Sequence, residues 1–432
     1  MFWTHEGLSS MSTCAVNDLD GTAMGFRLFR LHGYSVSPCV FKHFEKDGKF
    51  FCFPRESNQS VTAMFSLYRA AQFAFPGENE LERANIYSRV FLEERRASAK
   101  LKDKWVIAKD LPGEIGYALA FPWKTSLPRI ETRMYLEQYG GSADVWIGKV
   151  LYRMHLVNND MYLDMAKADF SSFQRRSRLE WLGLRKWHNK TNLGVFGVTP
   201  ERVLRAYFLA AANIFEPNRA AERLAWVRTA VVADAISRRL RENSCTDSMR
   251  ELLICKLDKN GGEEDPEKSL LYALLQLIDL PASDSDSCSL REAWKQWLRS
   301  IAKNSQESCE GNTALLLVRT VEICSGRYGS TEQNFNLEYS NLERLTSSIC
   351  GKLALRILSQ DGRKMQNIEN SDRQVDLEMR ELTQCVLQSC NSINRMSRQT
   401  FLDVTKSYYY VAHCSPKTIH SHISKVIFEH VI

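Results

Sequence analysis

Long apolar runs are absent from this sequence of 432 residues. No stretch approaches the roughly 20 apolar residues of a membrane-spanning helix, so we expect no membrane span. A strong excess of one charge is also missing, because 57 lysines and arginines stand against 51 aspartates and glutamates, which leaves a net charge of +6. That charge is too dilute for the concentrated basic face of a nucleic-acid-binding protein.

Closely paired cysteines are missing as well. The chain has 12 cysteines, but no two of them form a C-x-x-C pair and their spacings are irregular. This pattern disfavours a disulfide framework and a structural zinc site, and it fits a reducing compartment. Residues 1–21 lack the basic and apolar segments of a secretory signal, and they are too acidic and too short for a transit peptide.

The residues that are present suit a globular, helical protein. Hydrophobic residues make up 44% of the chain and charged residues 25%, which is enough apolar material to bury a core. The length allows two or three domains at roughly 150 residues each. Apolar residues recur at i, i+3, i+4 and i+7 over long segments, and strict alternation is rare. The sequence therefore predicts an all-α fold.

Several element boundaries can be predicted from the pattern. Helices are expected over 61–75 and 81–96, and Pro76-Gly77 should end the first of them. The segment 103–141 holds prolines, glycines and many aromatic residues, so it should not be helical throughout. Further on, Thr199-Pro200 predicts a helix start, with threonine as the cap and proline in the first turn.

Loops and a domain boundary are predicted in the rest of the chain. The polar segments 258–268 and 281–289 are rich in Gly, Pro, Ser and Asp, which is typical of loops. The composition shifts near residue 190, where an aromatic, Pro/Gly-rich part gives way to long helices. We therefore expect one domain over 1–188 and a second over 189–432.

Two aspartates, Asp18 and Asp20, stand one residue apart just before a helical pattern. On spacing alone, the simplest interpretation is that Asp20 caps the helix, because aspartate is a favoured N-cap. The alternative is a catalytic carboxyl pair. Two acids close together cannot both ionise cheaply, so one of them can be held protonated and act as a proton donor.

The wider stretch NDLDGTAMGFRLFRLHGYSVSPCVFKHF resembles the acid motif of the plant class II diterpene cyclases, the copalyl diphosphate synthases. The resemblance continues in order along nearly the whole chain, through AMFSLYRAAQFAFPGE, DKWVIAKDLPGEIGYALAFPW, RIETRMYLEQYGG, KWHNKTNLGVFGVTPERVLRAYFLAAANIFEP and YYYVAHCSPKTIHSHISKVIFEHV. It implies the C-terminal part of a terpene cyclase β domain, a partial α-barrel, over 1–188. An α-helical terpenoid synthase α domain would follow over 189–432.

The resemblance also implies a reaction. The family cyclises geranylgeranyl diphosphate to copalyl diphosphate, an isomerisation of diterpenoid (gibberellin or defence) biosynthesis in the chloroplast that requires Mg²⁺. An acid protonates the terminal alkene, which needs a dry pocket and hydrogen-bonded carboxyl neighbours. The family motif is Asp-x-Asp-Asp with the middle aspartate as donor. Asp18 matches its first position, Asp20 its middle position, and Gly21 stands where the last aspartate is expected.

Further site residues are implied by the same matching. Lys104 matches a family lysine that helps to hold the substrate diphosphate, a task suited to a point cation. Magnesium would be held by Asp18 and Asp20 or by the diphosphate itself. Ring faces could stabilise a carbocation by about 0.5–2 kcal/mol each, although core packing is the alternative role for any one of these residues. The candidates are Trp105, Tyr117, Phe121, Trp123, Tyr135 and Tyr139.

Class I chemistry is not expected. It needs a D-D-x-x-D cluster that holds magnesium on the diphosphate, and at the matching place this chain reads WVRTAVVADAI, with Asp234 alone. The resemblance further implies that family members are longer and carry a γ domain that closes the active site. A rival interpretation is therefore an inactive remnant, or a scaffold that associates with other terpene synthases.

Overall fold

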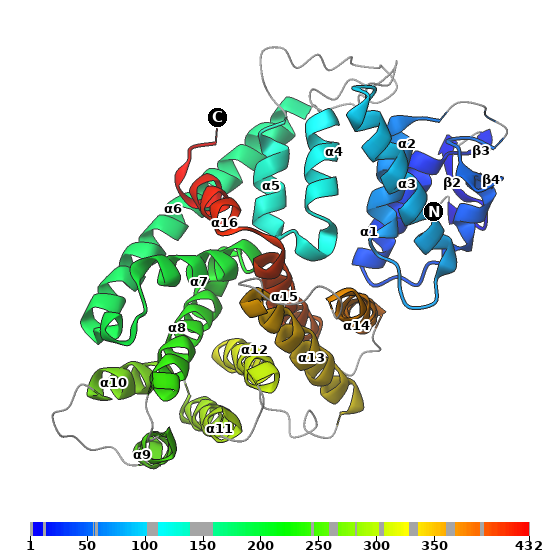
Figure 1. The fold of residues 1–432 in the computed structure, drawn as a ribbon. Coiled ribbons are helices and arrows are strands. Elements are labelled where there is room, and N and C mark those ends of the chain that lie inside the picture. Colours follow the sequence, from blue (N-terminus) through cyan, green and yellow to red (C-terminus); the bar gives the residue numbers. More distant parts are fainter. Residues whose placement is uncertain are drawn as a thin grey trace.

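The computed structural model describes residues 3–11, 14–54, 56, 59–101, 111–138, 159–242, 246–258, 267–280, 283–301, 306–327, 336–359, 368–388 and 393–431. Over these residues the protein is built mainly from helices, with a few short strands near the N-terminus (Figure 1). The predicted all-α fold is thereby confirmed. None of the helices in the described ranges combines the length and the apolar character that a membrane crossing needs.

The first part of the chain combines small sheets with helices. One sheet pairs β1 (Trp3–Thr4), β2 (Gly7–Met11) and β3 (Cys14–Asn17) in that order, all antiparallel, and a second pairs β4 (Glu45–Lys46) with β5 (Lys49–Phe50). The helices are α1 (Leu19–Leu31), η1 (Pro38–Phe44), α2 (Val61–Ala71), α3 (Asn79–Ala97), α4 (Leu111–Ala120), η2 (Trp123–Thr125) and α5 (Pro128–Leu136).

The second part is an assembly of longer helices around α8, α12, α13 and α15 (Figure 1). Its elements are α6 (Asn159–Thr191), η3 (Leu193–Phe196), α7 (Pro200–Asn213), η4 (Pro217–Arg219), α8 (Ala220–Glu242), α9 (Thr246–Asp258), α10 (Glu267–Ile278), α11 (Asp284–Ile301), α12 (Gln306–Cys324), α13 (Leu337–Ser359), α14 (Ile368–Gln388), α15 (Arg395–His413), α16 (Pro416–Ile423) and the π-helical turn η7 (Ser424–Phe428).

Two hydrophobic cores divide the described residues. One gathers buried apolar side chains between Leu19 and Ala118, and the other gathers those between Leu127 and Val431. Helix α6 packs into the second core, which contains Phe170 and Trp187. The division between the two hydrophobic cores thus lies between Ala118 and Leu127. The division of the chain into a domain over 1–188 and a domain over 189–432 remains a prediction.

Several expected boundaries differ from those observed. The helix expected over 61–75 ends at Ala71. The segment 103–141 was expected not to be helical throughout, and over its described residues this is confirmed: α4 ends at Ala120 and α5 begins at Pro128, with only the short η2 between them. Pro112 and Pro128 stand in the first turns of α4 and α5. The loop predicted over 281–289 is wrong, since α11 begins at Asp284. Aspartates are favoured at a helix N-terminus, so the same composition serves a helix start.

Arg30 of α1 is the central polar residue of the first core. Its side chain is 1% exposed and lies over the rings of Phe26 at 4.4 Å and Phe75 at 4.0 Å. The guanidinium donates to both carboxylate oxygens of Glu78, at 2.6 and 2.5 Å, and to the carbonyl of Phe73 at 2.6 Å. This bidentate pair joins α1 to the segment that follows α2.

We expect Arg30→Met to lower the free energy of unfolding by about 3 kcal/mol, because it leaves the Glu78 carboxylate partly buried without its main partner. Urea unfolding followed by circular dichroism measures this loss. Adding Glu78→Gln should restore part of it. The matched control is Arg83→Met, which breaks the more exposed pair of Arg83 with Glu45 and should change stability little. Equal losses in the two single variants would contradict the role given to Arg30.

Candidate active site

The acid motif lies where β3 ends and α1 begins. Asp18 follows β3 in an extended conformation, with φ −117° and ψ 148°, and it is the N-cap of α1. Its Oδ1 accepts a hydrogen bond from the backbone N–H of Gly21 at 2.6 Å. The expectation that Asp20 is the cap was therefore wrong by two residues. Asp20 lies in the first turn of α1.

Cys52 is a neighbour of both aspartates that the sequence reasoning missed. Its carbonyl accepts from the backbone N–H of Leu19 at 2.9 Å, and the backbone of Asp20 makes a hydrogen bond with its thiol. Burial, together with the charges of Asp18 and Asp20, raises the pKa of the Cys52 thiol to about 12. The thiol therefore stays protonated at neutral pH, so this neighbour of the two aspartates carries no charge.

A close backbone contact holds the first turn of α1 in place. Gly7 of β2 has a φ of +115°, and a Cβ there would lie only 2.4 Å from Oγ1 of Thr22. The same Oγ1 accepts from the backbone N–H of Leu8 at 3.0 Å, and Thr22 is fully buried. Because only glycine allows this approach, the hairpin anchors the helix turn that carries Asp20.

Gly21 lies directly beside the carboxylate of Asp18. A Cβ added at Gly21 would be 3.2 Å from Oδ1 and 3.3 Å from Oδ2 of Asp18. An aspartate at this position would therefore place a second carboxyl group against the first after a small adjustment of Asp18.

The donor set at the motif suits one kind of metal binding only. No group of three metal-binding side chains occurs within the part of the chain that the structure describes. Magnesium, however, is commonly held by one or two carboxylates together with substrate phosphates and water. Asp18 and Asp20 fit that mode, and their assignment as magnesium ligands remains a prediction. Lys104, the predicted diphosphate ligand, lies outside the described residues.

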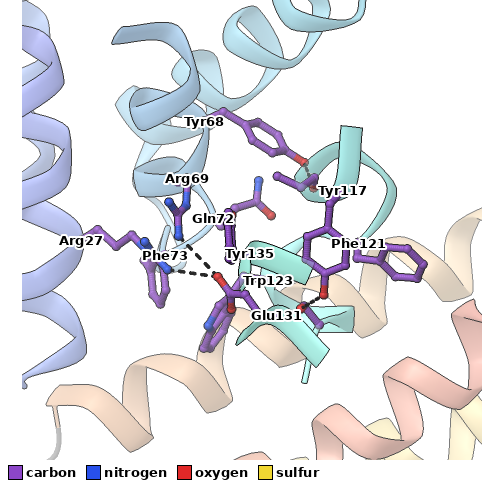
Figure 2. A pocket seen from close by; sticks show the side chains of 12 residues that line it. Arg27, Tyr68, Arg69, Gln72, Phe73, Tyr117, Phe121, Trp123, Glu131 and Tyr135 are labelled. Carbon is purple, nitrogen blue, oxygen red and sulfur yellow. Dashed lines mark hydrogen bonds and ion pairs between the residues drawn. The ribbon is translucent and has the colours of Figure 1, made fainter. Parts of the chain in front are cut away.

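Four of the six aromatic candidates surround one pocket, and Figure 2 shows their arrangement. The other two, Trp105 and Tyr139, lie outside the described residues. Residues of α1, α2, α4, η2 and α5 line this pocket, which has an empty volume of about 350 Å³, its mouth included. The four aromatic candidates in the lining are Tyr117, Phe121, Trp123 and Tyr135.

Neither Asp18 nor Asp20 lines this aromatic pocket. Arg27 is the residue of α1 that lines the pocket. It follows Asp20 by seven positions, which is about 10 Å along a helix. Arg27 and Arg69 both form ion pairs with Oε1 of Glu131, at 3.6 and 3.4 Å (Figure 2). Two guanidinium groups sharing one carboxylate leave positive charge at the wall, which opposes a carbocation. The carbocation-lining role of these rings remains a prediction.

Asp234, the only aspartate at the class I position, is held by two arginines. Its carboxylate contacts Nη1 of Arg202 at 3.2 Å and Nε of Arg238 at 2.9 Å. Each of its two carboxylate oxygens is thus engaged by a guanidinium group, and the absence of class I chemistry remains a prediction from the sequence.

Comparison with known proteins places these residues in context. Residues 3–119 match the family model described as "Terpene synthase, N-terminal domain". The chain is 59% identical over 438 residues to ent-copalyl diphosphate synthase 2, chloroplastic, of Oryza sativa subsp. japonica. This match covers 99% of this chain and 55% of the rice protein. It is 55% identical to syn-copalyl diphosphate synthase, chloroplastic, of the same subspecies, covering 100% of this chain and 54% of the relative. The chain thus spans about half the length of these relatives.

Solved structures show the same fold. The crystal structure of ent-copalyl diphosphate synthase from Arabidopsis thaliana, in complex with an aza analogue of geranylgeranyl thiolodiphosphate, superposes with a TM-score of 0.85 at 37% identity. It covers 99% of this chain and 60% of the Arabidopsis chain. Abietadiene synthase from Abies grandis superposes with a TM-score of 0.86 at 23% identity, which speaks for the fold alone.

Proposed function

We propose that this chain, which belongs to the terpene synthase family, is the part of a copalyl diphosphate synthase that carries the proton donor. The reaction would be the protonation-initiated cyclisation of geranylgeranyl diphosphate to copalyl diphosphate. The observation that carries the proposal is the separation of roles in the acid motif. Asp18 is the N-cap of α1 and accepts from the backbone N–H of Gly21, while Asp20 stands in the first turn of the helix.

Asp20 would donate its proton to the terminal alkene of the substrate. An alkene is a very weak base, so the acid has to be neutral and shielded from water when the substrate is in place. The environment next to the motif is uncharged. It consists of the protonated thiol of Cys52 and the buried side chains of Leu19 and Thr22. After the proton has been transferred, the new carboxylate would lie in the first turn of α1, and a helix N-terminus favours such a charge.

The substrate diphosphate would be held apart from this acid. Lys104 is the candidate ligand within this chain, and a lysine ammonium suits a polyphosphate as a point charge. Magnesium bound to the diphosphate would neutralise phosphate charge. Magnesium bound to Asp18 and Asp20 is the alternative, and it would keep Asp20 deprotonated, so it excludes Asp20 as the donor while the metal is there. The rice relatives are named as chloroplastic, and we extend that location and a role in diterpenoid biosynthesis to this protein.

The proposal is tested by product analysis. The chain would be incubated with geranylgeranyl diphosphate and magnesium, both alone and fused behind the N-terminal segment of the 59% identical rice relative. After phosphatase treatment, we expect copalol from the fusion by gas chromatography and mass spectrometry. If the intact rice relative makes copalol under these conditions and neither form of this chain does, the rival interpretation of an inactive remnant or scaffold is correct.

A further inference from the structure

Helix α6 has apolar side chains on two opposite sides. On one side, Phe170 and Phe173 pack into the second core and are at most 2% exposed. On the other side, Met165, Leu179 and Leu182 are 63%, 65% and 50% exposed. A surface helix normally carries its large apolar residues on the one face that packs against the core. The second apolar side of α6 therefore needs an explanation of its own.

The exposed apolar residues of α6 follow a stripe along the helix. Met161, Met165, Ala168, Ser172 and Leu179 succeed one another by steps of four, three, four and seven residues. Such steps keep side chains on the same side of a helix, and their alternation is typical of the seam between two packed helices. This α6 stripe is about 27 Å long. No described element covers its large side chains, and the second half of α6 lies at the edge of the molecule in Figure 1.

The α6 stripe is similar in both directions from Ser172. Met165 lies seven residues before Ser172, and Leu179 lies seven residues after it. A second α6 that crosses in the antiparallel direction at Ser172 would therefore bring Met165 of each copy against Leu179 of the other. The small side chains of Ala168 and Ser172 lie near the crossing point, where they allow the two helix axes to approach closely.

The charges of α6 favour the same antiparallel arrangement. All four arginines of this helix follow Ser172 in the sequence, and all of its aspartates precede it. Asp169 lies three residues before Ser172 and Arg176 four residues after it, which places both on the same flank of the stripe. In an antiparallel pair, Asp169 of one copy comes level with Arg176 of the other to within one residue. The Asp169 side chain pairs with Arg129 at 2.9 Å but is 57% exposed, so it can accept from a second guanidinium.

Other occupants of the α6 stripe fit these charges less well. A parallel pair would place the arginines of one copy beside those of the other, and like charges in contact oppose association. A lipid surface attracts helices whose polar face is rich in Lys and Arg, whereas the first half of α6 carries aspartates. An antiparallel copy supplies the opposite charge along the stripe, and its two-fold axis makes every contact twice.

We propose that the α6 stripe is a self-association surface, on which α6 of a second copy of this chain packs in the antiparallel direction around Ser172. Stable protein complexes bury roughly 1,200–2,000 Å² in total, and a single pair of helices over about 27 Å buries less, so the dimer should be reversible. The acid motif belongs to the first core and α6 packs into the second. The dimer is therefore not required for the activity proposed above.

The first test is the mass of this chain in solution, measured by light scattering after size exclusion at about 1–100 µM, where weak association is detected. We expect the mass to rise with concentration from 49.7 kDa towards twice that value. The variant Met165→Glu/Leu179→Glu should stay at 49.7 kDa throughout, because it places carboxylates in the contact. The matched control is Ile86→Glu/Val90→Glu, which changes two exposed apolar residues of α3 and should associate like the unaltered chain. Circular dichroism verifies that both variants fold, as expected for exposed positions.

Cysteine cross-linking tests the direction of the two helices. Helix α6 contains no cysteine, so Ser172→Cys adds one at the crossing point, and mild oxidation should give a covalent dimer beyond the background of the unaltered chain. Lys186→Cys lies 14 residues further along the helix, so its two copies would be about 42 Å apart in an antiparallel pair and should not cross-link.

A charge reversal tests the contact between Asp169 and Arg176. Arg176→Glu should raise the Kd of the dimer by about tenfold, since the contact occurs twice, whereas Arg185→Glu, on the same helix but off the stripe, should not. A mass of 49.7 kDa at every concentration, an intact dimer of Met165→Glu/Leu179→Glu, or cross-linking of Lys186→Cys would each overturn the proposal. None of these outcomes depends on copalol formation, so the two proposals fail separately.

Discussion

Asp20→Asn should lower the rate of copalyl diphosphate formation by about 10²–10⁴-fold, the typical contribution of a positioned general acid. Asparagine keeps the size and polarity of the side chain in the first turn of α1, but its amide N–H is far too weak an acid to protonate an alkene. The helix start should survive, because its cap is Asp18 rather than Asp20. We expect kcat to fall while KM changes little, since the diphosphate would be held elsewhere.

Two variants make this result specific. Asp18→Asn retains a capping residue, because asparagine caps as well as aspartate does, and should cost less activity than Asp20→Asn. Asp164→Asn changes an exposed carboxylate on α6 and should have no effect. The measurement is the initial rate of copalol release from the active fusion after dephosphorylation. A larger loss in Asp18→Asn than in Asp20→Asn would exchange the roles of the two aspartates.

The acid motif illustrates what the sequence can predict locally. Its position at the start of a helix followed from the residues themselves, but the cap was placed at Asp20 instead of Asp18, and the strand that precedes the helix was not predicted. Either aspartate satisfies the preference for a cap, and the choice depends on where β3 ends. Cys52 lies 34 positions from Asp18, and only the packing of α1 against the segment after β5 brings its thiol to the motif.

The second core shows what the sequence cannot predict. The start of α7 at Pro200 was predicted and is confirmed, because a proline in the first turn is a local signal. Thr199 is the N-cap residue as predicted, but its side chain makes no capping hydrogen bond. The pairing of Asp234 with Arg202 and Arg238 was missed, although the spacing of Asp234 and Arg238 on one helix face is visible in the sequence. Their meeting with Arg202 depends on α7 and α8 running side by side, and no local pattern carries that information.

Gly21→Asp should raise the rate of copalyl diphosphate formation by about tenfold or more, an effect that corresponds to roughly 1.4 kcal/mol. A Cβ at this position lies 3.2 Å from Oδ1 of Asp18, so the added carboxyl group meets an existing one. Carboxyl groups in contact share protons, because both cannot ionise cheaply side by side. The cluster should then hold a proton near Asp20 at neutral pH, where two carboxyl groups alone hold it less well.

Gly21→Asn separates this chemistry from a simple gain in rigidity. Both substitutions remove the flexibility of glycine from the first turn of α1, so both should make the helix start more rigid. Only aspartate adds a titratable group, and only it should shift the pH profile of kcat upward. If Gly21→Asn raises the rate as much as Gly21→Asp does, rigidity rather than acidity limits the enzyme. If neither changes the rate, Asp20 delivers its proton without a third carboxyl group, and Gly21 is then compatible with full activity.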